Sequence, residues 1–359
     1  MPRDEEGRFD ELLSVADLER LLCSGALRHP GFRLVKAGEK LEVGAYTKSI
    51  PWRPEPFTGT ADIGRVLAEF EAGATLVLQG LHHSWPPLAE FCRLFERELG
   101  HPAQANAYFT PREAQGLPVH HDTHDVFSLQ VSGEKRWLVY EPALELPLKD
   151  QHYDPDLGGP GEPLHDVLLR PGDTLYLPRG WLHEARTSST DSLHITVGIN
   201  VYTWLDAFKA ALRECEEEVD FRRSPDGDAD ELVRRLHERL RPDAVAARQR
   251  RKLVRTRRPV LPGQLTQIRS LDDLALDTPL ERRPTVLFEL DRLTLSFEGK
   301  DIRFPDGVEE ALEFVAVGEE PFSAADIPSD LDDKSRLVLV RRLVREGFLR
   351  LRAPNTTKL

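Results

Sequence analysis

The chain has 359 residues, a formal net charge of −13 and 40% hydrophobic residues. This length accommodates two or three domains, and the hydrophobic content is sufficient for a packed core. The acidic balance argues against a general nucleic-acid coat or a binder of anionic membranes. Cys23, Cys92 and Cys215 form no CxxC pair, which excludes a thiolate zinc site and indicates a reduced, cytoplasmic protein. No apolar stretch reaches the roughly 18 residues of a membrane-spanning helix, and the N-terminus lacks a secretory signal.

The first hundred residues predict helices that alternate with short strands. Ser14 and Asp17 are candidate helix caps before leucines at helical spacing. The apolar run at 74–81, which is bounded by glycines, is typical of a buried strand. Residues 87–99 predict an amphipathic helix.

From about Ala105 to Tyr202, short strand-like runs alternate with Gly/Pro turns, which indicates a sandwich or barrel. Helices with long charged faces are expected after Trp204, and such helices often pack against another chain. Their basic end, RQRRKLVRTRRP, is either a contact for RNA or, in better agreement with the overall acidity, a solvated helix end. The last hundred residues predict a hairpin with Gly299 in its turn, then helix, short helix, helix and strand, which is a winged-helix-like order.

A dense group of metal-binding residue types lies in the segment HHDTHD. On a strand, residues i and i+2 share a face, so His120 pairs with Asp122 or Asp122 pairs with His124, while His121 and Asp125 face the other way. His120 and His124 would lie about 13 Å apart along an extended strand, which is too far for both to bind one metal at ligand distances of about 2 Å. The position at the strand entrance favours the first pair and assigns His124 to the lining of a pocket.

A third ligand is expected from the segment RPGDTLYLPRGWLHEA, in which His183 begins a returning strand after two turns. Two histidines and one carboxylate form the facial triad of non-haem Fe(II) oxygenases, which leaves metal positions open for O₂ and a co-substrate. Zinc hydrolase chemistry fits less well, because no further acidic or basic residue lies at a sequence spacing typical of a hydrolase. The alternative without a metal is a set of hydrogen-bonded histidines in an ordinary barrel.

The segments HHDTHDVFSLQVSGEKRW, RPGDTLYLPRGWLHEA and SLHITVG together resemble the cupin-4 branch of the JmjC-type Fe(II)/2-oxoglutarate oxygenases, and within it the ribosomal oxygenases. The resemblance covers residues 105–200 well and is weaker before residue 60. It implies an α+β chain with a double-stranded β-helix, also called a cupin or jelly-roll barrel, at about 75–202 of a catalytic domain with flanking helices. The implied domains are the catalytic domain 1–202, a helical dimerisation segment 203–258 and a winged-helix-like domain 259–359.

The resemblance also implies the roles of individual residues, with no catalytic residue beyond the metal ligands. Fe(II) is expected at His120, Asp122 and His183. The distal carboxylate of 2-oxoglutarate is expected at Lys135, with Arg136 as the alternative. Asn106, Thr196 and His194 are expected beside the co-substrate. Residues expected to line the substrate pocket, or to pack in the core or rim, are Tyr108, Gln115, His124 and Trp137.

The function implied by the resemblance is Fe(II)- and 2-oxoglutarate-dependent hydroxylation of a His or Arg side chain on a ribosomal protein. O₂ is consumed, and succinate and CO₂ are released. A homodimer is expected, with no membrane or nucleic-acid partner. One alternative keeps the chemistry but changes the outcome: a peptide natural-product precursor is modified, or an N-methyl group is removed. The other is a non-catalytic cupin sensor with a DNA-contacting winged helix.

Overall fold

The computed structural model describes residues 7–157, 159–225 and 229–352. The chain divides into two compact units, one formed by residues up to Glu96 with His101–Val201, the other by Arg97–Gly100 with residues from Tyr202 onward. Within the described residues, no helix is both long enough and apolar enough to cross a membrane.

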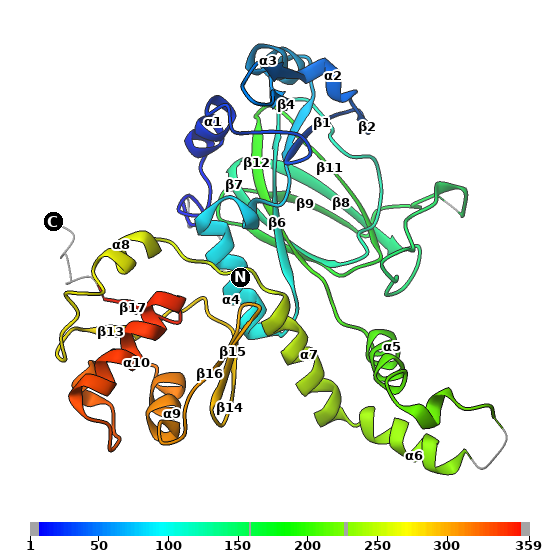
Figure 1. Ribbon diagram of the computed structural model, residues 1–359. Coiled ribbons are helices and arrows are strands. Elements are labelled where there is room, and N and C mark those ends of the chain that lie inside the picture. Colours follow the sequence, from blue (N-terminus) through cyan, green and yellow to red (C-terminus); the bar gives the residue numbers. More distant parts are fainter. Residues whose placement is uncertain (1–6, 158, 226–228, 353–359) are drawn as a thin grey trace. The chain divides into compact units, whose positions relative to one another are not determined.

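Two sheets form the centre of the first unit (Figure 1). The large sheet has the strand order β10-β7-β12-β6-β5-β1-β2, and the small sheet has the order β11-β8-β9. The strands of the large sheet are β1 Phe32–Lys36, β2 Glu39–Lys40, β5 Thr75–Leu78, β6 Ala103–Thr110, β7 Asp125–Gly133, β10 Thr174–Leu177 and β12 Ser192–Ile199. The strands of the small sheet are β8 Lys135–Pro142, β9 His165–Leu169 and β11 Trp181–Arg186.

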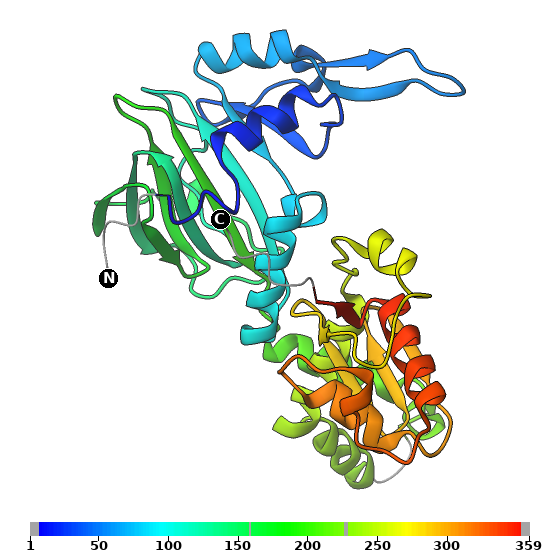
Figure 2. The ribbon, with the colours of Figure 1, turned by 90° about the vertical axis from the view of Figure 1, so that its left-hand side faces the viewer.

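Helices cover the outer face of the large sheet, and a separate hairpin projects from the unit (Figure 2). The remaining elements are α1 Val15–Cys23, α2 Val43–Tyr46, β3 Thr47–Ile50, β4 Phe57–Ala61, α3 Ile63–Glu71, η1 Leu81–His83, α4 Pro86–Leu99 and η2 Pro155–Leu157. The expected caps of α1 are confirmed, because the Ser14 hydroxyl accepts from the Asp17 amide and the Asp17 carboxylate accepts from the Ser14 amide, each at 3.1 Å.

Strand β6 shows how the sequence gives the large sheet two different faces. Ala103, Ala105 and Ala107 are buried and pack in one cluster with leucines of α1 and α4, so their small side chains allow the helices close to the sheet. The intervening residues, such as Asn106 and Tyr108, point to the opposite face because side chains alternate along a strand. That inner face meets the small sheet, where Val126 and Leu177 pack in one cluster with Trp137, Val139 and Leu169.

The second unit contains the helices expected after Trp204 and the small C-terminal sheets. Its helices are α5 Trp204–Cys215, η3 Val219–Arg222, α6 Asp230–Arg239, α7 Pro242–Thr256, α8 Gln264–Arg269, α9 Glu309–Val317, η4 Ala324–Asp326 and α10 Asp333–Glu346. Strand β13 Leu280–Arg282 pairs with β17 Leu349–Leu351, and the second sheet consists of β14 Phe288–Asp291, β15 Thr294–Phe297 and β16 Lys300–Arg303.

The expected hairpin around Gly299 is the second half of a three-stranded antiparallel sheet, β14-β15-β16. Gly299 has φ +81° between β15 and β16, which agrees with its expected place in a turn. The order that follows, a helix, a short helix, a helix and a strand, is also the expected one.

The turn between β7 and β8 depends on Gly133. This residue has φ +63°, and a Cβ atom there would lie 1.8 Å from the backbone oxygen of Asp191. The backbone therefore approaches β12 more closely than any side chain permits. Because Lys135 is the first residue of β8, the same turn sets where this lysine enters the space between the sheets.

We expect Gly133→Ala to lower the free energy of unfolding by about 3 kcal/mol, since it adds a clash to an unfavourable left-handed backbone. Gly161→Ala is the matched control, because Gly161 has φ +68° but no atom within 4 Å of its Cβ position. The control is expected to cost only about 1 kcal/mol. Urea unfolding measures both, and equal losses would contradict the role of the close approach.

Candidate metal centre and cavity

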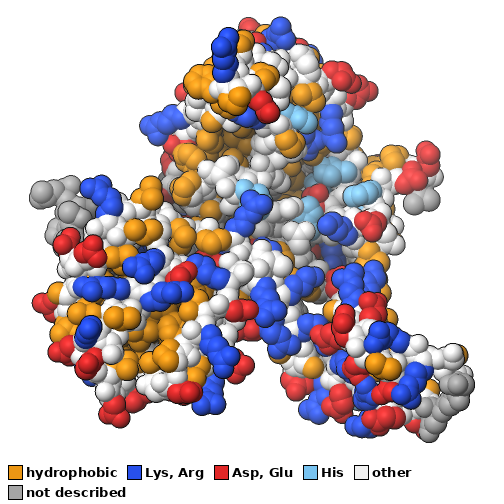
Figure 3. Space-filling view, in the orientation of Figure 1, with side chains coloured by type: hydrophobic (Ala, Val, Ile, Leu, Met, Phe, Trp, Pro, Cys, Tyr) orange, Lys and Arg blue, Asp and Glu red, His pale blue; other side chains and the backbone are white. Residues whose placement is uncertain are grey.

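A cavity of about 450 Å³ lies between the two sheets of the first unit. The large sheet contributes inner-face residues of β1, β5, β6, β7 and β12, and the small sheet contributes residues of β8 and β11. In Figure 3, histidine side chains gather around a hollow in this unit. The three cationic lining residues are Arg33, Lys40 and Lys135, and among the described residues Asp122 is the one carboxylate of the lining.

His120, Asp122 and His183 meet at the wall of this cavity. One possible ligand atom from each lies within 4.8 Å of the other two, and His183 Nε2 is 3.7 Å from Asp122 Oδ2. His120 Nδ1 lies 2.8 Å from the backbone oxygen of Pro118, and His183 Nδ1 lies 3.0 Å from that of Trp181. A carbonyl only accepts, so each Nδ1 carries the proton and each Nε2 has a lone pair available for a metal.

The backbone holds the two histidines in register. His120 and His183 form an isolated antiparallel bridge: the His120 amide donates to the His183 carbonyl at 3.1 Å, and the reverse bond is 2.8 Å. The Gly180 amide donates to the Asp122 carbonyl at 3.0 Å. Three hydrogen bonds thus fix the loop before β7 against the start of β11, and the three side chains follow from that pairing.

The protonation state of His183 suits metal binding. Burial, with a smaller contribution from His120, lowers the pKa of His183 to about 4. The imidazole is therefore neutral at physiological pH, and a neutral imidazole is the form that binds a metal.

Lys135 brings a buried positive charge to the same cavity. Its side chain is 3% exposed, and Nζ donates to Thr110 Oγ1 at 2.9 Å, which also accepts from Thr75 Oγ1 at 3.1 Å. Burial lowers the pKa of Lys135 to about 7. Within the described ranges, no carboxylate forms an ion pair with this ammonium, so a bound carboxylate would relieve an unfavourable charge.

Arg136, the alternative to Lys135, points away from the cavity. Its guanidinium pairs with Asp166 on the neighbouring strand β9, with Nε 2.6 Å from Oδ1, and both side chains are exposed. Alternation along β8 therefore decides between the two cations, and the inward one is Lys135.

Most of the other predicted site residues line the cavity, namely Asn106, Tyr108, His124, Trp137, His194 and Thr196. The Tyr108 ring stacks on His194 at 5.0 Å, and Trp137 meets His194 edge-on at 5.5 Å. Gln115 does not line the cavity: its amide donates to Glu184 Oε2 at 2.7 Å, outside the lining.

The strand geometry expected for residues 120–124 is wrong. Strand β7 begins only at Asp125, and His120 pairs with the rest of the fold through the isolated bridge alone. The segment is irregular, so side chains do not alternate, and His121 also lines the cavity. Asp125 does point elsewhere, since its oxygens accept from Tyr176 and from the Arg179 amide.

Several residues of the site were missed by reasoning from the sequence. Thr110, which accepts from Lys135 Nζ, continues the alternation of Asn106 and Tyr108 along β6, so the period of two could have found it. Arg33 and Lys40 come from the strand and turn near residue 36, and no local pattern distinguishes them from surface cations. Their position results from the pairing of β1 with β5, which is a long-range contact.

Comparison with known proteins shows what the chain resembles. A family model for the JmjC domain matches residues 82–207. Human "Ribosomal oxygenase 1" is 29% identical over 354 residues, which cover 94% of this chain and 51% of the human protein. The Drosophila persimilis "Bifunctional lysine-specific demethylase and histidyl-hydroxylase NO66" is 31% identical over 192 residues, 53% of this chain and 26% of the fly protein.

Solved structures from Escherichia coli share the fold. The ycfD crystal structure has a TM-score of 0.56 at 21% identity and covers 95% of this chain and 91% of that chain. A second structure, described as YcfD, a ribosomal oxygenase in complex with cobalt and 2-oxoglutarate, has a TM-score of 0.55 at 19% identity, with the same coverage. The chain spans about half the length of the human relative and about a quarter of the fly protein. The chain thus has the α+β cupin fold of the E. coli protein, a segment that matches the JmjC-domain model, and sequence similarity to ribosomal oxygenases over most of its length.

Proposed function

We propose that the protein is an Fe(II)- and 2-oxoglutarate-dependent oxygenase that hydroxylates a side chain of a protein substrate. One observation carries this proposal. Two imidazole Nε2 atoms and one carboxylate meet in a cavity that also contains a buried ammonium without a carboxylate partner among the described residues. A metal and a dicarboxylate satisfy these two features together, and neither feature is needed for a plain barrel.

The donor set fits the metal and the co-substrate. Two histidines and one aspartate bind one face of Fe(II) and leave its other positions open. Lys135 and the Thr110 hydroxyl would hold the distal carboxylate of 2-oxoglutarate and so orient its other end toward the triad. When bound, Fe(II) and 2-oxoglutarate supply the oxidising chemistry that uses O₂ and releases succinate and CO₂.

The remaining lining residues position the reactants and limit water. Trp137 and Val126 give the cavity apolar walls beside the triad and Lys135. His120, Asp122 and His183 act as ligands, so their neutral or carboxylate forms are needed throughout and none serves as an acid or base. The E. coli protein crystallised with cobalt and 2-oxoglutarate supports this pairing of metal and co-substrate.

For the substrate, we infer a His or Arg side chain of a ribosomal protein. The support comes from relatives: several are called ribosomal oxygenases, and the fly protein is called a histidyl-hydroxylase. Mass spectrometry of ribosomal proteins from cells with and without the gene tests this inference. The loss of one oxygen from a single His or Arg supports it, and an unchanged set contradicts it.

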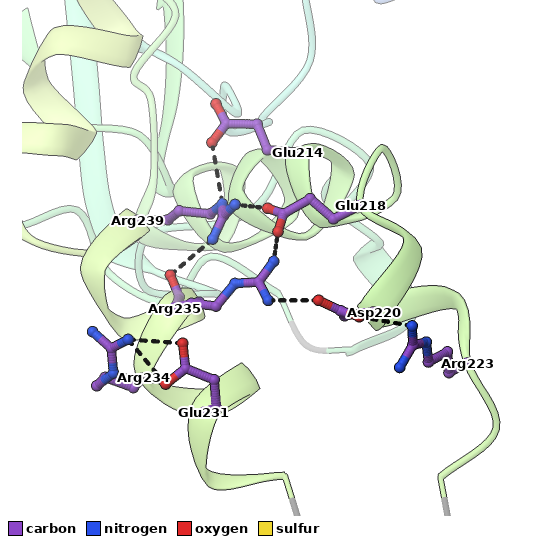
Figure 4. Close-up of polar contacts among 8 residues, drawn as sticks. All are labelled: Glu214, Glu218, Asp220, Arg223, Glu231, Arg234, Arg235 and Arg239. Atoms are coloured by element: carbon purple, nitrogen blue, oxygen red, sulfur yellow. Dashed lines mark hydrogen bonds and ion pairs between the residues drawn. The ribbon is translucent and has the colours of Figure 1, made fainter.

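We also propose that α5–α7 form the interface of a homodimer, followed by a winged-helix-like domain. Helix α5 exposes four large apolar side chains on one side, namely Trp204, Leu205, Phe208 and Leu212. Figure 4 shows how ion pairs fix α6 beside the end of α5: Arg235 and Arg239 both contact Glu218, and Arg235 Nη1 lies 3.1 Å from Asp220 Oδ2. Sedimentation equilibrium should give twice the chain mass, and a monomer mass would refute the interface.

Replacing a metal ligand should abolish turnover. We expect His120→Ala or Asp122→Ala to reduce Fe(II)-dependent succinate formation more than about 100-fold, because each change removes a ligand from the three. His165→Ala, on the exposed surface of β9, is the control and should match the wild type. Turnover near the wild-type level in either ligand variant would contradict the assignment.

Binding of 2-oxoglutarate should weaken as the pH rises above about 7. The pKa of Lys135 is lowered to about 7 by burial, so above that pH the free protein loses the charge that the dicarboxylate requires. By linkage, affinity should fall by up to about tenfold per pH unit between about pH 7 and pH 9. Calorimetry on the Mn(II)-loaded protein measures this slope.

Lys135→Met should bind 2-oxoglutarate weakly and without the slope. Lys149→Met removes an exposed lysine and is expected to keep both the affinity and its pH dependence. A wild-type affinity that is constant over this range would show that Lys135 is not the carboxylate partner.

A further inference from the structure

The imidazole of His124 occupies space that only a glycine at position 198 leaves open. A Cβ on residue 198 would lie 2.3 Å from His124 Cδ2 and 2.5 Å from its Nε2. Gly198 pairs with Gln104 of β6 and Val126 of β7 in the middle of the large sheet, so no turn explains a glycine here. Gly198 is therefore needed to make room for the imidazole of His124.

Among the described residues, this imidazole has a hydrogen-bond partner at one of its two ring nitrogens. His124 Nε2 lies 3.2 Å from the amide nitrogen of Gln104, which can only donate, so Nε2 accepts and the ring proton is on Nδ1. In the five-membered ring, Nδ1 is the atom opposite the Cδ2–Nε2 bond that faces Gly198. No group of the described residues hydrogen-bonds Nδ1, and His124 is part of the cavity lining. The cavity thus gains an N–H donor.

The register of β6 and β12 places this donor far from the proposed co-substrate anchor. Thr110, which binds Lys135, lies opposite Ser192, whereas Gln104 lies opposite Gly198. Six residues of β6 separate the two levels, which corresponds to about 20 Å along an antiparallel strand. His124 therefore lies toward the end of the cavity that the distal carboxylate of 2-oxoglutarate does not occupy, where a substrate side chain would enter.

We propose that His124 is a substrate-contacting residue that donates from Nδ1 to an acceptor atom of the substrate side chain, and that Gly198 makes room for it. This inference rests on the proposed function and narrows its substrate class. A guanidinium has five donors and no acceptor, whereas a neutral imidazole has one acceptor nitrogen. Arg33 and Lys40, the two cavity cations not assigned to the co-substrate, also disfavour a guanidinium. The site thus selects histidine over arginine.

The test uses two synthetic peptide libraries that are random except for a central His or a central Arg. The wild type, loaded with Fe(II) and 2-oxoglutarate, should add one oxygen to the His library at least about tenfold faster than to the Arg library. His124→Ala and Gly198→Ala should each slow modification of the His library about tenfold, mainly through KM, since each removes one substrate hydrogen bond.

The double variant separates a direct role from general damage. Once His124 is alanine, the nearest atom to an added methyl at position 198 is Cγ of the flexible Gln104 side chain, at 3.2 Å. The double variant should then be within about twofold of His124→Ala, so the two effects are strongly non-additive. His124→Asn places an amide nitrogen near the position of Nδ1 and should recover part of the lost rate, and His165→Ala, on the exposed surface of β9, should behave as the wild type.

Preference for the Arg library, modification of neither library, or additive effects of the two substitutions would each overturn the inference. Calorimetry of the wild type with Mn(II) and then 2-oxoglutarate distinguishes this failure from failure of the proposed function. If the wild type binds Mn(II) and 2-oxoglutarate normally but gives any of those outcomes, the role of His124 is refuted and the proposed oxygenase function is not. Absence of binding counts against the proposed oxygenase itself.

Discussion

The backbone bridge between His120 and His183 is the contact on which the candidate site depends. Its two hydrogen bonds, at 2.8 and 3.1 Å, join an irregular loop to the beginning of strand β11. They place both imidazoles at one cavity. Hydrogen bonds also fix the opposite face of β11. Glu184, the next residue, accepts from Tyr140 at 2.7 Å and from Gln115 at 2.7 Å, so β11 is anchored from the face opposite His183. Gln115 thus supports the site from outside.

A second constraint is electrostatic. Lys135 is buried beside hydroxyl groups, and burial lowers its pKa because a charge there loses its hydration. Together with Arg33 and Lys40, it makes the cavity positive apart from the aspartate of the triad. Such a cavity favours an anionic co-substrate, which would neutralise Lys135, while Arg33 and Lys40 would still favour a neutral substrate group.

Local patterns in the sequence predicted much of this arrangement. The Ser14–Asp17 cap is a property of neighbouring residues and is observed. Lys135 or Arg136 was expected in the site from the resemblance, and the alternation along β8 in the structure places Lys135 inward and Arg136 outward. His120 and Asp122 were preferred on an assumed strand geometry that is not observed, and His183 was expected from a distant segment, yet the structure brings the three ligand atoms together.

What could not be predicted depends on contacts between distant segments. Residues 120–124 contain no turn signal that shows the segment to be irregular, so the expected alternation failed there, and His121 reached the cavity. The relation of His124 to Gly198 exists only because β7 and β12 are neighbours, and Gly198 alone reads as a weakened strand position. Arg33 likewise reaches the cavity only through the pairing of β1 with β5.

The most direct test of the account is a crystal structure of the protein grown without O₂ in the presence of Mn(II) and 2-oxoglutarate. The account predicts one metal ion at about 2.2 Å from His120 Nε2, His183 Nε2 and an Asp122 oxygen. It also predicts the distal carboxylate of 2-oxoglutarate within about 3 Å of Lys135 Nζ. A metal bound elsewhere, or a dicarboxylate that leaves Lys135 without a carboxylate partner, would contradict it.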